Sequence, residues 1–176
     1  LDKETSGIMM LAHGRGAAAM FSTALAARQI HKTYLAVICN SPPKRASMID
    51  QRLVHERKDG RIQHQPAQTR YQLLARAPSH KASIVLLQPV SGRKHQLRRH
   101  LQGLGCPIIG DRRYGSRQQE PFPVKRLALH AWRLELPDAL LGAGETFTAQ
   151  PDQAFLALVK QLIPGDELME MLHRTT

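Results

Sequence analysis

Short apolar runs bounded by turn residues divide much of the chain into segments typical of buried β-strands. Residues 7–12 form one such run, and residues 33–39, which are rich in β-branched and aromatic side chains, form a second that stops at Asn-Ser-Pro-Pro over 40–43. Because proline removes a backbone donor from the ladder, we expect the second strand to end there. Two further runs, 69–75 and 82–87, are joined by a short connection that favours antiparallel pairing.

Other segments repeat their apolar residues with the period of an α-helix. Residues 17–30 are rich in alanine, and Met20, Leu25 and Ile30 lie roughly on one face, which predicts a helix after the Gly-Arg-Gly turn. Starting signals predict two more helices near the end of the chain, over residues 150–162 and 164–174.

A fourth helix is predicted over residues 95–104, where Leu97, Leu101 and Leu104 are spaced by four and three and Arg98 lies beside their face. The preceding polar segment, residues 44–68, is rich in arginine and lysine, and we interpret it as a mobile basic loop with a turn, or the tip of a hairpin, at its Asp-Gly pair. Alternation predicts a last long strand over residues 126–136, with one side formed by Leu127, Leu129 and Ala131. Strands of mixed direction with helices at the flanks indicate an α+β fold.

Length and composition indicate one globular domain over residues 1–176 with a polyanionic partner. The 176 residues weigh 19.7 kDa and carry 25 Lys+Arg against 14 Asp+Glu, a net charge of +11. Nucleic acid is favoured over a membrane surface, since no long amphipathic helix with bulky apolar anchors opposite Lys/Arg is evident. No apolar stretch approaches the roughly 20 residues of a membrane span. Only two cysteines occur, Cys39 and Cys106, which favours a reducing, cytoplasmic location. The chain opens at Leu1 without an initiator Met, and we expect it to be part of a longer protein.

Two places along the chain could carry chemistry. Asp2 could be a nucleophile, a helix cap or a surface charge, and base rates favour the last. The segment 91–100 holds three arginines, one lysine and two histidines, and it could bind phosphate at a helix start or form a solvated basic face. His95 and His100 are five residues apart, which is poor spacing for a metal, and no nucleotide loop or other cofactor motif occurs.

Four segments, in fixed order, carry a family resemblance. Residues 1–7 read LDKETSG, residues 32–37 read KTYLAV, and residues 126–131 read RLALHA. Between them, GRKHQLRRHL at residues 92–101 is followed by GCPIIGDRRYG at residues 105–115. These segments resemble the HRLDxxTSG, KxYxAxV, GRxHQLRxHL…GHPIxGDxxYG and RLxLHA motifs of RluA-type pseudouridine synthases. The His-Arg pair that precedes LD in the family is absent, and a cysteine stands where His is usual in the third motif.

The resemblance implies an enzyme that isomerises uridine in ribosomal or transfer RNA to pseudouridine, with no cofactor and no metal. It also implies a mixed, largely antiparallel central sheet and a catalytic domain that here lacks its N-terminal segment. Asp2 matches the family's catalytic aspartate, Arg98 its arginine partner and Tyr34 its active-site tyrosine. Leu129 matches the apolar residue beneath the base. The residues that would bind the RNA are Arg93, Lys94, His95, Gln96, Leu129 and His130.

Two other functions remain as alternatives at this stage. A non-catalytic RNA-binding module would explain the charge and the basic segments equally well, but it has no need of an acid, an aromatic and a basic residue in one set. An RNA hydrolase would need a metal or a histidine pair that the chain does not offer. Taken alone, Tyr34 and His130 are more often residues at the edge of a core than catalytic groups. We expect a monomer, with no membrane partner.

Overall fold

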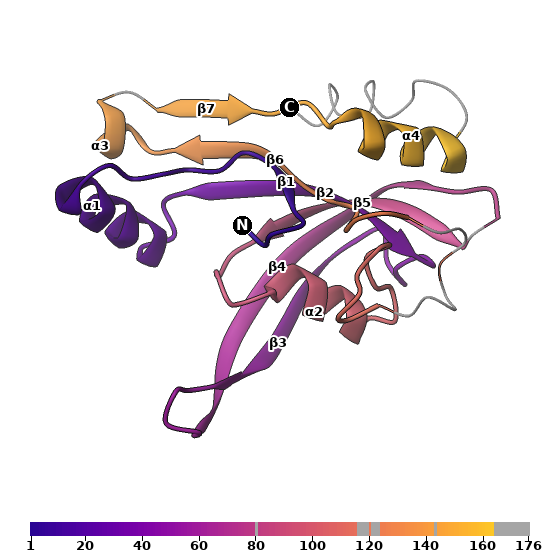
Figure 1. The fold of residues 1–176 in the computed structure, drawn as a ribbon, viewed down its shortest axis with the longest axis horizontal. Coiled ribbons are helices and arrows are strands. Elements are labelled where there is room, and N and C mark those ends of the chain that lie inside the picture. Colours follow the sequence, from indigo (N-terminus) through magenta and orange to yellow (C-terminus); the bar gives the residue numbers. More distant parts are fainter. Residues whose placement is uncertain (80, 116–119, 121–123, 143, 164–176) are drawn as a thin grey trace.

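The computed structural model describes residues 1–79, 81–115, 120, 124–142 and 144–163. A seven-stranded sheet organises them, with strand order β1-β6-β2-β5-β4-β3 and β7 paired with β6 (Figure 1). The β1–β6 pair is parallel, and the other five pairs are antiparallel. The predicted α+β fold with a mixed, largely antiparallel sheet is confirmed.

Four strands, β2 to β5, follow one another without a helix between them, and the other strands are separated by helices. The strands are β1 (Ser6–Gly7), β2 (His31–Cys39), β3 (Ala46–Glu56), β4 (Ile62–Arg76), β5 (Ala82–Pro89), β6 (Leu129–Leu136) and β7 (Glu145–Thr148). The helices are α1 (Arg15–Ala26), α2 (Gln96–Gly103), α3 (Asp138–Leu141) and α4 (Gln153–Leu162).

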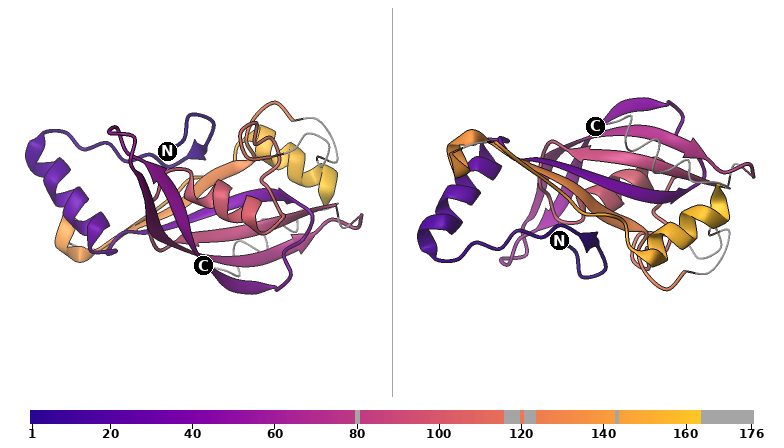
Figure 2. Two further views of the ribbon diagram at one scale, coloured as in Figure 1. Left: turned by 90° about the horizontal axis from the view of Figure 1, so that it is seen from below. Right: turned by 90° about the horizontal axis from the view of Figure 1, so that it is seen from above.

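The core lies around β2 and β5, with one helix on each face of the sheet. Helix α2 packs against β3, β4 and β5, α4 packs against β5, and Figure 2 shows the two helices on opposite sides of the strands. Leu97 and Leu101 of α2 are buried in the core cluster together with Phe155 of α4. The predicted strands at 33–39, 69–75 and 82–87 and the predicted helices at 95–104 and 150–162 are confirmed. Helix α4 begins as expected for a capped helix, because the carboxylate of Asp152 accepts a hydrogen bond from the Phe155 amide.

The predicted strand over residues 7–12 is wrong, because pairing stops at Gly7. The chain leaves the sheet there with a φ of +100° at Gly7, and the side chains beyond it are largely exposed, Met9 to 63% and Leu11 to 83%. An apolar run at the edge of a sheet has the composition of a strand without the burial that would hold it as one. Helix α1 is present, but Met20 and Leu25 are also exposed on it, since α1 packs chiefly against the small helix α3.

The segment 44–68 is built mainly of strand, so its interpretation as a mobile loop is wrong and the predicted hairpin tip is confirmed. Strands β3 and β4 pair over eleven residues and project from the body of the fold (Figure 1). The turn lies at Asp59-Gly60, where Gly60 has a φ of +77°. Most residues of the outer part of the hairpin, 50–66, are exposed, so the hydrophobic alternation that marks a half-buried strand is missing there, whereas β4 buries alternate residues from Ala67 to Leu73.

The end of the chain departs from prediction in smaller ways. The last long strand begins at Leu129 instead of residue 126, and the sequence did not indicate β7 or α3. The helix predicted over residues 164–174 lies outside the described residues.

Candidate active site

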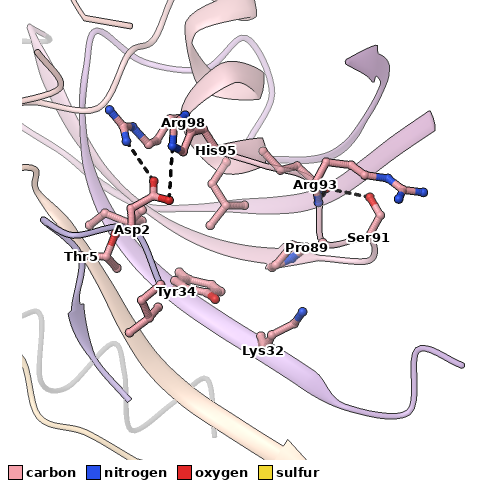
Figure 3. Close-up of a pocket in the computed structure, with 14 residues that line it drawn as sticks. Asp2, Thr5, Lys32, Tyr34, Pro89, Ser91, Arg93, His95 and Arg98 are labelled. Carbon is pink, nitrogen blue, oxygen red and sulfur yellow. Dashed lines mark hydrogen bonds and ion pairs between the residues drawn. The ribbon is translucent and has the colours of Figure 1, made fainter. Parts of the chain in front are cut away.

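A cavity of about 120 Å³ opens where the amino-terminal turn, β2, the end of β5 and the start of α2 meet (Figure 3). Its walls come from segments that are far apart along the chain. The lining residues are Leu1, Asp2, Thr5, Lys32, Tyr34, Pro89, Ser91, Gly92, Arg93, His95, Gln96, Leu97, Arg98 and Leu129. The cavity therefore brings together most of the site residues predicted from the sequence.

Asp2 is fixed by a turn that the sheet anchors. The Thr5 amide donates a hydrogen bond to the Asp2 carbonyl at 2.9 Å, and Ser6 and Gly7 then pair with His130 and Ala131 of β6. A Cβ atom at Gly7 would lie 2.1 Å from the Ala131 carbonyl oxygen, so this close approach requires glycine. Residues 1–7 are thus held against β6, and this segment, which we call the amino-terminal clamp, fixes the position of Asp2 in the cavity.

Arg98 links Asp2 to a second, buried carboxylate. Its Nη1 donates to Asp2 Oδ2 at 2.9 Å, while Nε and Nη2 donate to the two oxygens of Asp111, each at 2.8 Å. The Arg98 side chain is 8% exposed and that of Asp111 only 1%. The hydrogen bond with Asp111, aided by the one with Asp2, raises the pKa of Arg98 above its ordinary value and outweighs the opposing effect of burial. The guanidinium therefore remains charged and fixed in direction.

Asp111 is itself held by the loop that carries it. Burial opposes its ionisation, but the hydrogen bonds from Arg98 and from the backbone amides of Tyr114 and Arg113 keep the pKa of its carboxyl below the usual value. Those amides donate to Asp111 Oδ1 at 2.9 and 3.0 Å respectively. A buried carboxylate with this many donors stays ionised and rigid, which makes it a support for Arg98.

His95 faces the other oxygen of Asp2. Its Nε2 lies 3.7 Å from Asp2 Oδ1, and its Nδ1 lies 2.9 Å from the hydroxyl of Tyr114. Burial lowers the pKa of His95, opposed by the charge of Asp2 and assisted by the nearby cations, first among them Arg98. A neutral ring that turns Nε2–H toward the carboxylate accepts a hydrogen bond from the Tyr114 hydroxyl at Nδ1. The Tyr114 ring also lies 5.1 Å from the Arg98 guanidinium carbon, so one tyrosine contacts both groups that face Asp2.

Tyr34 and Leu129 supply the apolar part of the cavity. Tyr34 lies on β2 and Leu129 on the neighbouring strand β6, and both line the cavity beside Asp2 (Figure 3 labels Tyr34). Burial, with a further contribution from the charge of Asp2, raises the pKa of the Tyr34 hydroxyl. The ring therefore presents a protonated phenol next to an apolar surface.

Gln96 is buried, and the oxygen and the nitrogen of its amide each have two hydrogen-bond partners within the protein. Its oxygen accepts from the Ser91 hydroxyl at 2.8 Å and from the Arg93 amide at 3.0 Å, and its nitrogen donates to the Gln68 carbonyl at 2.8 Å and to Thr69 Oγ1 at 3.0 Å. These bonds tie the loop before α2 to β4. A direct contact between Gln96 and substrate stays a prediction.

The other residues predicted to bind RNA divide between the mouth of the cavity and places outside it. Arg93 lines the mouth, exposed, and its Nε donates to the Pro66 carbonyl at 3.3 Å. Lys94 is exposed and is not among the lining residues. His130 points to the opposite face of the sheet, where its ring contacts Phe155 of α4 and is 1% exposed.

The nitrogens of His130 both have protein partners. Nε2 donates to the Ala149 carbonyl at 2.9 Å, which leaves Nδ1 to accept from the Ser6 hydroxyl at 2.9 Å. Burial lowers the pKa of His130, so the neutral ring bridges β1 to the end of β7. Its place in the structure supports the amino-terminal clamp, and contact with substrate stays a prediction.

Sequence reasoning assigned no role to several residues that the structure brings to the site: Thr5, Lys32, Ser91, Asp111 and Tyr114. Asp111 and Tyr114 lie within the GDxxYG segment, so a motif signal existed, but spacing alone does not say which side chains turn inward. Within the described part of the chain, no group of three metal-ligating side chains occurs and no helix is long and apolar enough to span a membrane.

Comparison with known proteins gives consistent matches. The family model described as RNA pseudouridylate synthase matches residues 1–103. The chain is 34% identical to tRNA pseudouridine synthase C of Salmonella typhi, over 97% of this chain and 75% of that protein, and 33% identical to the dual-specificity RNA pseudouridine synthase RluA of Escherichia coli, over 86% and 71%. Human RNA pseudouridylate synthase domain containing 4 superposes with a TM-score of 0.76 at 29% identity, over 94% of this chain and 76% of that one.

Proposed function

The chain belongs to the RluA-type RNA pseudouridine synthases, and we propose that it converts specific uridines of structured tRNA or rRNA to pseudouridine with Asp2 as the catalytic carboxylate. One observation carries the assignment of the residues. A carboxylate held by an arginine at 2.9 Å lies beside a tyrosine and a leucine in one cavity. A protein that only bound RNA would have no use for an acid oriented in this way.

The reaction rearranges bonds within one nucleotide. The bond from the ribose C1′ to the uracil N1 breaks, the base turns, a bond from C1′ to C5 forms, and the proton on C5 moves to N1. Asp2 acts on the ribose, either at C1′ as a nucleophile or on the 2′ proton as a base. Both roles need a carboxylate with a fixed direction, and the hydrogen bond of 2.9 Å from Arg98 supplies that direction.

Tyr34 and Leu129 hold the uracil that has left its stack. Since C1′ and C5 are not accessible inside folded RNA, the target nucleotide is extruded into the cavity. An aromatic face and an apolar side chain receive the flat base without selecting an orientation by hydrogen bonds, which allows the base to turn. The phenol of Tyr34 is protonated, so we assign it to stacking and to relaying the C5 proton, and not to acting as a free phenolate.

We further propose that residues 1–176 form one catalytic domain that works as a cytoplasmic monomer. Cys39 and Cys106 are both buried and free, which fits a reducing compartment. RNA binding needs no second subunit in this account, because the cavity and the exposed cations around it come from one chain.

Release of tritium tests the function directly. Transcripts of tRNA and rRNA carrying uridine labelled with tritium at C5 are incubated with the protein and with an Asp2→Asn variant. We expect release from one RNA class by the wild type and none by Asp2→Asn. A folded wild-type protein that binds these RNAs and releases no tritium would contradict the proposed synthase activity. The non-catalytic RNA-binding module would then be the better account of the function.

A further inference from the structure

A groove of about 770 Å³ continues from the active-site cavity toward the end of α1. The two spaces share five lining residues: Lys32, Pro89, Ser91, Gly92 and Arg93. The groove runs between the end of α1 and the segment that follows it, the first residues of β2, Arg70 in the middle of β4, the end of β5 with the loop after it, and Glu135 of β6. It is therefore a path by which a polymer can leave the cavity.

The groove is lined by cations. Arg28, Lys32, Arg70 and Arg93 line it, against the single acid Glu135, which is paired with Arg133 at 3.0 Å. Within the described residues, the side chains of Arg28, Lys32 and Arg70 form no hydrogen bond or ion pair, and Arg93 donates one weak bond to a carbonyl. Positive charge without protein partners favours a polyanion in this groove.

Lys32 occupies a special position among these cations. It lines the active-site cavity, the groove and a third, mainly apolar cavity that Tyr34 also lines, and among the described residues no other lines all three. Figure 3 shows its ammonium turned toward the Pro89 side of the cavity, and a Cβ atom built on Gly92 would lie 3.9 Å from Nζ. Lys32 is half-buried, and burial lowers its pKa. A half-buried, unpaired ammonium is costly for the free protein, and an anion that arrives there relieves the cost.

We propose that Lys32 binds the backbone phosphate next to the target uridine and that the RNA strand leaves the active site along the groove lined by Arg28, Arg70 and Arg93. This inference rests on the proposed function, since it takes the occupant of the cavity to be a flipped nucleotide. Tyr34 lies two residues after Lys32 on the same strand. The strand therefore fixes the distance between the ring that stacks on the uracil and the ammonium that binds the phosphate. Lys32 is then a binding residue. By holding the phosphate while Tyr34 holds the base, it positions the ribose against Asp2.

The test measures affinity, salt dependence and the response to one neutral phosphate. Synthetic RNA stem-loops with one loop uridine are made with all phosphates, and with a single uncharged methylphosphonate on either side of that uridine. Lys32→Met should weaken binding of the all-phosphate RNA about tenfold and lower the slope of log K against log salt by about 1. The matching methylphosphonate should weaken the wild type by the same factor and Lys32→Met no further.

Two variants control for charge and for folding. Lys81→Met removes an exposed lysine at the opposite end of β5, about 25 Å from the cavity by the strand rise, and its affinity should remain within about twofold of wild type. Lys32→Arg keeps the charge and should retain most of the affinity. Thermal melts of all variants establish that they are folded.

Two results would overturn the assignment of Lys32. One is a Lys32→Met variant that binds like Lys81→Met, and the other is a methylphosphonate that weakens Lys32→Met as much as it weakens the wild type. Conversion of uridine by the wild type, followed in parallel, reports on the proposed function separately. Conversion without an effect of Lys32 rejects the phosphate site alone, whereas a Lys32 effect without conversion keeps the phosphate site and rejects the synthase.

Discussion

The two walls of the active-site cavity differ in whether their charged side chains have protein partners. On the α2 side, Arg98, Asp111 and His95 are connected to one another or to Asp2 and Tyr114 by contacts between 2.8 and 3.7 Å. On the β2 side, Lys32 and the arginines of the groove have almost no protein partners. The first arrangement fixes groups in advance, as a chemical step requires, and the second leaves charges free for a ligand.

The difference follows from cost and benefit for the folded protein. A buried arginine and carboxylate are tolerated only when each has good partners, and Asp111 has the two arginine nitrogens and two backbone amides. The exposed arginines of the groove, Arg28, Arg70 and Arg93, cost little while solvated, and they can exchange water and counterions for phosphate, whereas the half-buried Lys32 gains more when an anion arrives. If this division is correct, changes to one wall affect the chemical step or stability, and changes to the other affect RNA affinity.

Asp2→Asn should have the largest effect. The amide cannot act as a nucleophile or base, so turnover should fall by about 10³-fold or more while RNA affinity falls less than about tenfold. Single-turnover tritium release and a filter-binding titration on the same RNA measure the two quantities. A variant that keeps its turnover, or that loses affinity as steeply as turnover, would break the division between the walls.

Arg98→Ala should be the most destabilising change on the α2 side. It leaves Asp111, whose side chain is 1% exposed, without its ion-pair partner, at a cost of about 3–5 kcal/mol in the free energy of unfolding, and it also slows catalysis by freeing Asp2. Denaturant unfolding measures the cost. As a matched control, Arg126→Ala breaks the more exposed pair with Asp152 and should cost less than about 1 kcal/mol. Equal losses in the two variants would contradict the contrast between buried and exposed pairs.

Acid should destabilise the fold through its buried histidines. Burial lowers the pKa of His100 and His130 in the folded protein, so the unfolded chain binds more protons between the folded values and an unfolded value of about 6.5. Stability is complete above that range and is lost as the pH falls through it. Melting temperatures between neutral pH and about pH 5 should decline, and less steeply in His130→Gln. A His130→Gln variant with the wild-type slope would show that His130 does not titrate in this way.

Tyr114→Phe should have the smallest effect. It removes the hydroxyl that contacts His95 and keeps the ring beside Arg98, so we expect a drop of several-fold in kcat, little change in KM, and a higher pKa for His95 in the pH profile of kcat. The pH profile separates this positioning role from a general loss of packing, which would leave the apparent pKa in place. An unchanged pH profile together with an unchanged kcat would show that Tyr114 does not position His95 for the reaction.

The parts of the fold that could be predicted from sequence are those with regular burial. Residues 33–39 and 82–87 are buried almost throughout, and α2 buries Leu97 and Leu101, so composition and period were sufficient. Residues 8–12 have a similar composition but lie largely at the surface, and the outer part of the β3–β4 hairpin, residues 50–66, is largely exposed. The hydrophobic pattern therefore misled the prediction in both places.

The site shows a similar limit. Ninety-six positions separate Asp2 from Arg98, and periodicity cannot bring them together, whereas the family resemblance did. Alternation along β6 could have separated the neighbours Leu129 and His130, because consecutive strand residues face opposite sides. The inward turn of Asp111 and Tyr114 depends on the loop backbone, which the sequence pattern does not specify.

The most direct measurement of the whole account is tritium release across a range of RNA concentrations for wild type, Asp2→Asn and Lys32→Met. We predict that Asp2→Asn shows no release at any concentration although it binds the RNA, and that the loss in Lys32→Met lies in KM more than in kcat. Release by Asp2→Asn at a rate near that of the wild type would contradict the central claim that the carboxylate held by Arg98 performs the chemistry.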